Sequence, residues 1–188
     1  MIHGLSDGHW SMSDAILAMA DLVGPSELVV CTWTAAQADI RRAHALLDRG
    51  LFRSVRFIVD RSFMTRQAEY CRLLRQSFGD AAIRVANSHA KFAVLTGGAY
   101  DALLLTSMNL NSNPRIENFS LFCGGRLPAE YLQLVDDLFA IQAPGDGFET
   151  ARAGRRDTAR VLGSPEPVNQ PETTIATSLN EWLDQGGG

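Results

Sequence analysis

Lysine is almost absent from this chain. Only one of its 188 residues, Lys91, is a lysine, and the other sixteen of its 17 Lys and Arg residues are arginine. An ammonium is a compact point charge with rotatable donors, whereas a guanidinium is a planar fork. Lys91 stands two residues after His89, so a site that needs a point charge beside a histidine would keep it. Chance survival of one lysine explains the count equally well, so the count alone does not decide between a functional lysine and an incidental one.

Cysteine is also scarce. Cys31, Cys71 and Cys123 are odd in number and widely spaced, with no CxxC motif and no paired Cys/His spacing. This pattern predicts neither a disulfide framework nor a structural zinc site. Cys31 and Cys123 lie in apolar runs, where we expect them to be buried as small hydrophobic residues. We expect no cofactor and no metal.

Long hydrophobic runs are missing as well. The apolar runs are too short to span a bilayer, and residues 1–10 lack the basic flank and apolar core of a secretory signal. The length suits one domain of ordinary size. We therefore expect a soluble, cytoplasmic protein that has no membrane partner.

The charge is unevenly distributed along the chain. The formal net charge is −4, yet residues 35–91 carry eleven Arg or Lys against five Asp or Glu. One interpretation is a basic surface for a polyanionic partner, offset by an acidic remainder. The other is that the arginines are solvated on helix exteriors, and the sequence favours neither.

The first half of the chain alternates helices and strands. A capped helix is predicted from Ser11 to Val23, before Gly24-Pro25. Branched apolar runs then predict strands, and Ala- and Leu-rich stretches predict helices. The expected order is strand 27–33, helix 35–49, strand 54–60 and helix 65–78. This order is typical of an α/β layer with parallel strand pairing.

The second half is richer in strands. We expect one long strand over 83–95, further strands over 101–108 and 118–123, and a hairpin turn at Gly97-Gly98. An amphipathic helix is predicted over 127–142. The fold class is therefore α/β, with a mixed β-sheet flanked by helices.

The chain divides into a domain and a tail. The domain is predicted to cover residues 1–143, and residues 144–188 are rich in Gly, Pro, Thr and charge. We expect this tail to be mostly disordered. The exception is residues 173–185, where Ile175, Leu179, Trp182 and Leu183 recur at helical spacing.

Five polar residues fall at the ends of the predicted strands. His89 and Lys91, one residue apart on a strand, would project from the same face. Ser107 and Asn109 end the next strand, and Glu117 precedes the third. Buried polar groups need partners, so these side chains are expected to contact one another and a ligand.

This set matches the roles that phosphodiester chemistry requires. An imidazole, here His89, can attack phosphorus and form a covalent phosphohistidine. Glu117 is our candidate for fixing its tautomer. Lys91, Asn109 and Ser107 would donate to the non-bridging oxygens. No second histidine–lysine pair exists in the chain, so the acid for the leaving oxygen should be His89 of a second subunit in a homodimer.

Three other residues are candidates for substrate binding. Trp33 follows the first predicted strand at its C-terminal end, where α/β folds gather ligands. It could wall a phosphate site, stack on a base or simply belong to the core. Arg61 and Arg66 flank the end of the second strand and could contact a phosphate backbone or remain ordinary surface arginines.

The motif resembles that of the phospholipase D superfamily, which has HxK, then a GSxN-like element and an acidic residue. The matching residues are His89-Ala90-Lys91, then Thr106-Ser107-Met108-Asn109, then Glu117. A single HxK in a chain of this size is similar to the small bacterial nuclease branch, which dimerises to complete its site. The resemblance implies a phospholipase D-like half forming a homodimer, a phosphohistidine mechanism and no metal.

The chain departs from the superfamily pattern at two positions. Thr96 stands where the superfamily has an aspartate, and the nearest candidate, Asp101, lies beyond the glycine turn. Thr106 stands where the GSxN-like element begins with glycine, which would tighten the phosphate pocket.

The main hypothesis is a metal-independent phosphodiesterase that acts on nucleic acid, in the first place DNA, as a homodimer. The alternative, favoured by Thr96, Thr106 and the tail, is a non-catalytic module. Such a module would keep the phosphate pocket to bind DNA or a protein partner.

Overall fold

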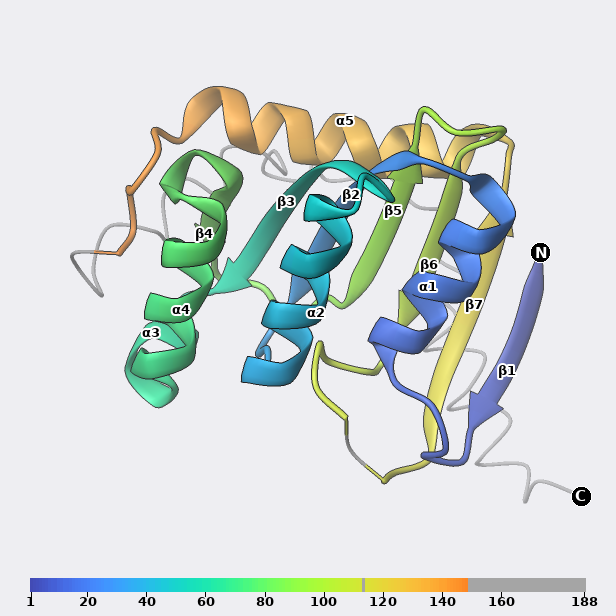
Figure 1. The fold of residues 1–188 in the computed structure, drawn as a ribbon, viewed down its shortest axis with the longest axis horizontal. Coiled ribbons are helices and arrows are strands. Elements are labelled where there is room, and N and C mark those ends of the chain that lie inside the picture. The colour runs from blue at the N-terminus through green and yellow to red at the C-terminus, as the bar shows by residue number, and fades with distance from the viewer. Residues whose placement is uncertain (113, 149–188) are drawn as a thin grey trace, which may run out of the picture.

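One seven-stranded sheet organises the molecule in this computed structural model, which describes residues 1–112 and 114–148 (Figure 1). Its strands, in chain order, are β1 Ile2–Ser6, β2 Ser26–Thr32, β3 Phe52–Asp60, β4 Ile83–Ala86, β5 Phe92–Thr96, β6 Ala102–Thr106 and β7 Glu117–Cys123. Across the sheet the order is β1-β7-β6-β5-β2-β3-β4. The predicted fold class, a mixed α/β sheet flanked by helices, is confirmed.

Strand pairing changes from parallel to antiparallel once, in the middle of the sheet. β2, β3 and β4 are parallel, as predicted, whereas β5 runs antiparallel to β2, and the ladder continues antiparallel through β6, β7 and β1. The carboxyl ends of β2, β3, β4 and β6 therefore lie at the same edge as the amino ends of β5 and β7. This is the lower edge of the sheet in Figure 1.

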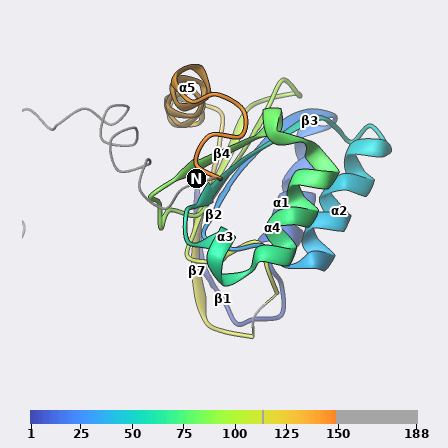
Figure 2. The ribbon, with the colours of Figure 1, turned by 90° about the vertical axis from the view of Figure 1, so that its left-hand side faces the viewer.

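Helices cover both faces of the sheet, and each face has its own apolar cluster (Figure 2). One face carries α1 Met12–Val23, α2 Gln37–Asp48, the one-turn α3 Phe63–Arg66 and α4 Ala68–Phe78, and a 3₁₀ turn follows at Asp80–Ala82. Of the described helices, α5 Arg126–Ile141 alone covers the other face. Phe57 and Leu104 belong to the first cluster, and Val94 and Leu103 belong to the second.

The start of α1 follows its sequence signal. Ser11 is the N-cap, its hydroxyl accepts from the Asp14 backbone N–H, and the Asp14 carboxylate accepts from the Ser11 backbone N–H at 2.9 Å. This reciprocal capping satisfies two of the helix's free donors. Asp14 also accepts from Arg42 of α2 at 2.7 Å, so the cap joins the first two helices.

The prediction of one long strand over 83–95 is wrong. The chain forms β4 at the edge of the sheet, leaves it at Asn87, and returns as β5 beside β2. All residues of β4 are buried, as are the first four of β5, so two short buried strands give the same continuous apolar pattern as one long strand. His89 and Lys91 consequently lie in the connecting loop and not on a strand.

Two further elements differ from expectation. The helix predicted over 65–78 is interrupted at Gln67, whose backbone leaves the helical region at φ −141° and ψ 56°. Its side-chain Oε1 accepts from the Thr34 hydroxyl, a long-range contact that local sequence does not reveal. β1 was not predicted at all, and it pairs antiparallel only with β7, more than a hundred residues later in the chain.

The predicted Gly97-Gly98 turn does join two antiparallel neighbours, β5 and β6. Gly97 has a φ of +77°, which favours glycine. Gly98 lies against α1, where an added Cβ would meet the Val23 carbonyl oxygen at 2.5 Å. The adjacent Ala99 N–H donates to that same oxygen at 2.8 Å, so the turn is fixed to the end of α1.

The described chain continues a few residues past α5. Gln142 pairs with the backbone of β4, accepting from Val85 N–H at 2.9 Å and donating to Val85 O at 3.0 Å. Phe148 packs against the larger cluster, with the Arg75 guanidinium 4.4 Å from its ring centroid. The predicted segment 173–185, and the tail from residue 149 onward, lie outside the described residues.

Within the described ranges, no helix is long and apolar enough to cross a membrane. The same part of the chain holds no group of three or more His, Cys, Asp or Glu side chains placed to bind a metal ion.

The three cysteines should differ sharply in reactivity. Cys31 and Cys71 are buried, whereas Cys123 is exposed, so the expected burial of Cys123 is wrong. Burial raises the pKa of Cys31 to about 12. At pH 8 roughly one Cys31 thiol in ten thousand is then a thiolate, the form that reacts. A disulfide reagent should modify one thiol per native chain and three after unfolding.

The Cys123→Ser variant is the matched control for this titration. It should react with none of its thiols until it unfolds. Rapid modification of a second thiol in the native Cys123→Ser protein would contradict the packing around Cys31 and Cys71.

Candidate functional site

The predicted site residues meet at one edge of the sheet because of the strand directions. Trp33 follows β2, Arg61 follows β3, and His89 lies between β4 and β5. Lys91 directly precedes β5, Ser107 and Asn109 follow β6, and Glu117 opens β7. Six different strands thus bring their ends to a single region, which is the lower edge in Figure 1.

A cleft of about 660 Å³ opens at this edge. His89, Lys91 and Ser107 all line it, so the structure brings three of the five predicted catalytic residues to one surface. Its other lining residues are His3, Gly4, Ala90, Phe92, Leu105, Thr106, Asn118, Phe119, Ser120 and Tyr131. No carboxylate is among these lining residues in the described chain, and hydroxyl, amide and imidazole groups predominate among the polar ones. Such a cleft suits an anion.

Lys91 and His89 are in direct contact. The Lys91 ammonium lies 2.9 Å from His89 Nδ1 and 3.3 Å from His89 Nε2, and it donates to the His89 carbonyl oxygen at 2.7 Å. An ammonium has only donors, so a ring nitrogen that bonds to it must be unprotonated. The loop therefore holds the point charge against the imidazole, as the sequence predicts, although not through a shared strand face.

Lys91 is largely buried, whereas His89 is exposed. Burial lowers the pKa of Lys91, while Glu117, Cys31 and Asp60 act in the opposite direction. A partly desolvated ammonium that keeps its charge binds an anion more strongly than one in bulk water does. Lys91 is thus suited to hold a phosphate oxygen.

Glu117 contacts Ser107 and not His89. The Ser107 hydroxyl donates to the Glu117 carboxylate and accepts from the Asn118 backbone N–H at 3.0 Å. In the described residues no hydrogen bond joins Glu117 to His89, so the expected tautomer-fixing bond is not formed in this conformation. Glu117 instead orients Ser107 and acts on Lys91 through its charge.

Asn109 and Thr106 bind backbone groups. Asn109 Oδ1 accepts from the Trp33 backbone N–H at 3.2 Å, which links the ends of β6 and β2. The Thr106 hydroxyl donates to the Asn118 carbonyl at 2.7 Å and accepts from the Met108 N–H at 3.1 Å. Thr106 lines the cleft, but its hydroxyl locks β6 to β7.

Trp33 is placed between an arginine and the histidine. The Arg66 guanidinium lies 3.4 Å from the centroid of the Trp33 ring, and the His89 ring centroid lies 5.5 Å from it. Arg66 also donates to the Trp33 carbonyl at 3.2 Å and to the Ser62 hydroxyl at 3.0 Å. These contacts make Trp33 a wall beside His89, with one face occupied by a cation.

Most arginines of residues 35–91 are engaged within the molecule. Arg61 is half-buried, and its backbone N–H donates to Ala86 O at 3.0 Å, which joins the ends of β3 and β4. Other arginines of this segment bond to carboxylates or carbonyls, namely Arg42, Arg53, Arg56, Arg75 and Arg84. None of them lines the cleft, so this charge is spread over the molecule.

The loop that carries His89 is supported by residues that sequence reasoning did not single out. Asp60, at the end of β3, accepts from the Ser88 backbone N–H at 3.2 Å and from the Ser62 backbone N–H at 2.9 Å. The Cys31 thiol lies below the same loop and donates to the Ala90 carbonyl at 3.5 Å. These contacts fix the backbone on both sides of His89.

Thr96 lies at the opposite edge of the sheet from Lys91. Five residue steps along β5 separate the two, which is about 16 Å at strand spacing. Asp101 accepts from the Gly97 N–H at 3.3 Å and so caps the β5–β6 turn. An aspartate at position 96 would therefore not touch a phosphate held by Lys91.

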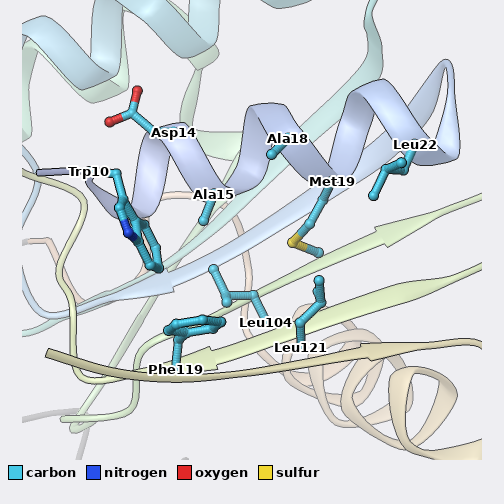
Figure 3. Close-up of a pocket in the computed structure, with 9 residues that line it drawn as sticks. All are labelled: Trp10, Asp14, Ala15, Ala18, Met19, Leu22, Leu104, Phe119 and Leu121. Atoms are coloured by element: carbon cyan, nitrogen blue, oxygen red, sulfur yellow. The ribbon is translucent and has the colours of Figure 1, made fainter. Parts of the chain in front are cut away.

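A second hollow, of about 300 Å³, lies on the other face of the sheet between α1 and strands β6 and β7 (Figure 3). Met19 and Leu22 face Leu104 and Leu121 across it, and Asp14 points away from the apolar side chains. Its side chains are apolar except for the Trp10 indole and the Asp14 carboxylate, so it suits an anion less well than the cleft at His89 does.

Sequence reasoning also missed His3, Asn118, Ser120 and Tyr131, which line the same cleft. His3 comes into the cleft through β1, which has no clear strand pattern. Ser120 and Asn118 alternate along β7, and that spacing was an available signal that they share a face.

Comparison with solved structures shows a known fold. The chain is similar to the phospholipase D family member Nuc from Salmonella typhimurium, with a TM-score of 0.53 and 16% identity over 72% of this chain and 91% of that one. It also resembles polyphosphate kinase from Porphyromonas gingivalis, with a TM-score of 0.52 and 12% identity over 86% of this chain. That match spans only 27% of the kinase.

No protein-family model matches the sequence, and no curated protein does. At identities this low, the structural matches establish the architecture and not the chemistry. The chain thus has the fold of a phospholipase D family member. Among the structures reported above, Nuc is the one that this chain covers almost completely.

Asp60 should be essential to the loop that holds His89. Replacing it with alanine leaves two backbone N–H groups without their acceptor, which should lower the free energy of unfolding by about 1–3 kcal/mol. Asp21→Ala, on the exposed part of α1, is the matched control and should change it by less than about 0.5 kcal/mol. Equal urea midpoints for the two variants would show that Asp60 does not support the loop.

Proposed function

We propose that this protein is a metal-independent phosphodiesterase acting on nucleic acid through a covalent phosphohistidine. The observation that carries the proposal is the contact between His89 and Lys91 at the wall of a donor-rich cleft, among whose described lining residues there is no carboxylate. The fold shared with a phospholipase D family member is consistent with this chemistry.

In the first step, a ring nitrogen of His89 attacks phosphorus. A nitrogen–phosphorus bond forms, and the bond to the leaving oxygen breaks as that oxygen takes a proton. Lys91 is placed to donate to the non-bridging oxygens, where charge gathers in the transition state, and the Ser107 hydroxyl can donate to them once its proton turns away from the Glu117 carboxylate. When a phosphate takes the Lys91 donors, the ammonium leaves His89, and the freed imidazole can act as the nucleophile.

In the second step, water displaces the histidine. The water loses a proton to the base that earlier acted as the acid, and the nitrogen–phosphorus bond breaks, which restores His89. His3 also lines the cleft, but it stands on the far side of β7 from Lys91. We assign the acid and base to His89 of the partner in a homodimer, where a two-fold axis would place the two cleft walls face to face.

The substrate class follows from the cleft. Phe92, Leu105 and Tyr131 give it apolar surface beside the polar donors, a combination that suits a sugar and base joined to phosphate. Trp33 and Arg66 are assigned to the wall that holds His89, and Arg61 remains our candidate for a contact to a neighbouring phosphate.

One observation favours the alternative of a non-catalytic phosphate-binding module. Glu117 bonds to Ser107, and the Lys91 ammonium contacts the acceptor nitrogen of the His89 ring, so the imidazole is not held in a nucleophilic state by a carboxylate. A module that only binds DNA or a protein partner would need nothing more than this arrangement.

Cleavage in the presence of a chelator separates the two functions. The purified protein should hydrolyse single-stranded DNA and a bis-aryl phosphodiester in excess EDTA. His89→Ala should lower the rate by about four orders of magnitude or more, because it removes the nucleophile.

His44→Gln, on α2, is the control and should retain the wild-type rate. Binding of DNA with no His89-dependent turnover would exclude the enzyme and leave the module.

Mixing subunits tests the shared site. If the two chains share one site, a ninefold excess of His89→Ala subunits should lower the activity of wild-type subunits about tenfold, because nearly every wild-type chain then pairs with a mutant. A ninefold excess of His44→Gln subunits should cause no such loss. Full activity in a fraction that sediments as a monomer would rule out this arrangement.

A further inference from the structure

The cleft extends well beyond the His89 and Lys91 pair. His3 on β1 and Ser120 on β7 line its far part, while His89 and Lys91 line the near part. In the strand register His3 is opposite Ser120, Ser120 is opposite Leu105, and Leu105 is opposite Phe92. Three strand spacings therefore separate His3 from Phe92, which is about 14 Å between their Cα atoms.

The His3 ring is held in place although it is exposed. His3 Nδ1 and Ser120 Oγ are 2.6 Å apart, and the ring meets the Phe122 ring edge-on at 6.2 Å between centroids. When the Ser120 hydroxyl donates to Nδ1, the proton of the neutral ring is on Nε2. His3 then presents an N–H donor that no contact within the described residues uses.

The neighbouring side chains complete a group of donors. Paired residues of adjacent strands share a face, and Leu105, the partner of Ser120 on β6, packs in the cluster beneath α5, so His3 and Ser120 project on that side of the sheet. Asn118 stands two residues before Ser120 on the same face and also lines the cleft. The His3 N–H and the Asn118 amide are thus donors in a part of the cleft where no described lining residue is a carboxylate, and the Ser120 hydroxyl holds the His3 ring.

We propose that His3 and Asn118, with Ser120 orienting the His3 ring, form a second anion subsite, which binds a phosphate of the same nucleic-acid strand some distance from the phosphate at His89. The subsite rests on the proposed function, because it takes the next part of the same substrate. At about 14 Å from Phe92, a side chain fixed to Ser120 reaches a neighbouring phosphate and not the reacting one. The subsite would thus make affinity depend on substrate length.

Binding to labelled oligonucleotides of increasing length tests the subsite without relying on turnover. All proteins carry His89→Ala to prevent cleavage, and fluorescence anisotropy gives Kd for a dinucleotide, a tetranucleotide and a hexanucleotide. The parent should gain affinity from two to six nucleotides. Adding His3→Gln should remove about tenfold of that gain, the size of one hydrogen bond to a charged group.

Two further variants keep the result decisive. Ser120→Ala removes the partner of His3 without touching the ring and should remove part of the same gain. His44→Gln, on the other face of the sheet, should leave the length dependence as in the parent. Thermal melting checks that each variant is folded. If the His3→Gln protein does not fold, the affinities of Ser120→Ala test the subsite.

The proposal is overturned if His3→Gln and Ser120→Ala keep the full gain with length, or if the parent shows no gain. Failure of the proposed function would be seen in a different experiment, the cleavage assay in chelator, as DNA binding without His89-dependent cleavage. A length-dependent gain that requires His3 would stand even in that case.

Discussion

The reversal of strand direction between β2 and β5 is the constraint on which the site depends. Because β5 runs antiparallel to β2, it begins at the carboxyl edge of the parallel strands, which is the edge where β4 ends. The loop that connects β4 to β5 therefore stays at this edge, and it carries His89 and ends at Lys91. The antiparallel ladder β5-β6-β7 then brings Ser107 and Glu117 to the same edge. Had β5 been parallel to β2, Lys91 would lie at the opposite edge of the sheet, where Thr96 now lies.

Burial of Lys91 explains how one lysine can serve this site. Its stem is enclosed while its ammonium reaches His89, and the Asp60 carboxylate and Cys31 thiol fix the loop around both residues. A guanidinium has a different shape and donor geometry, so arginine would not reproduce these contacts in the same space. The structure therefore gives a reason for a lysine at position 91 in a chain whose other basic residues are arginine.

The sequence predicted much of the fold because its main signals are local. The Ser11 capping box, the Gly97-Gly98 turn and the alternation of helices with β2 and β3 all depend on neighbouring residues. The split between β4 and β5 could not be seen, since both strands are buried on both faces and their apolar runs merge. β1 and the break at Gln67 depend on partners far along the chain, β7 and Thr34, which local pattern does not encode.

In the site, too, some features follow from the sequence and others depend on the three-dimensional structure. The residue types and their order indicated that His89, Lys91, Ser107 and Glu117 would gather, and the structure places them at one edge. Which of them form hydrogen bonds with each other depends on side-chain geometry, and Glu117 accepts a hydrogen bond from Ser107 and not from His89. The proposed mechanism therefore requires the Lys91 ammonium to move from the imidazole to the phosphate.

Trapping the intermediate tests the central claim most directly. Protein mixed with excess oligonucleotide in chelator would be quenched with alkali within milliseconds, digested and mapped by mass spectrometry. A nucleotide or phosphate adduct on the peptide containing His89, stable to alkali and labile to acid, is the predicted result. Turnover with no adduct on that peptide under any quench, or an adduct on another residue, would contradict the phosphohistidine mechanism.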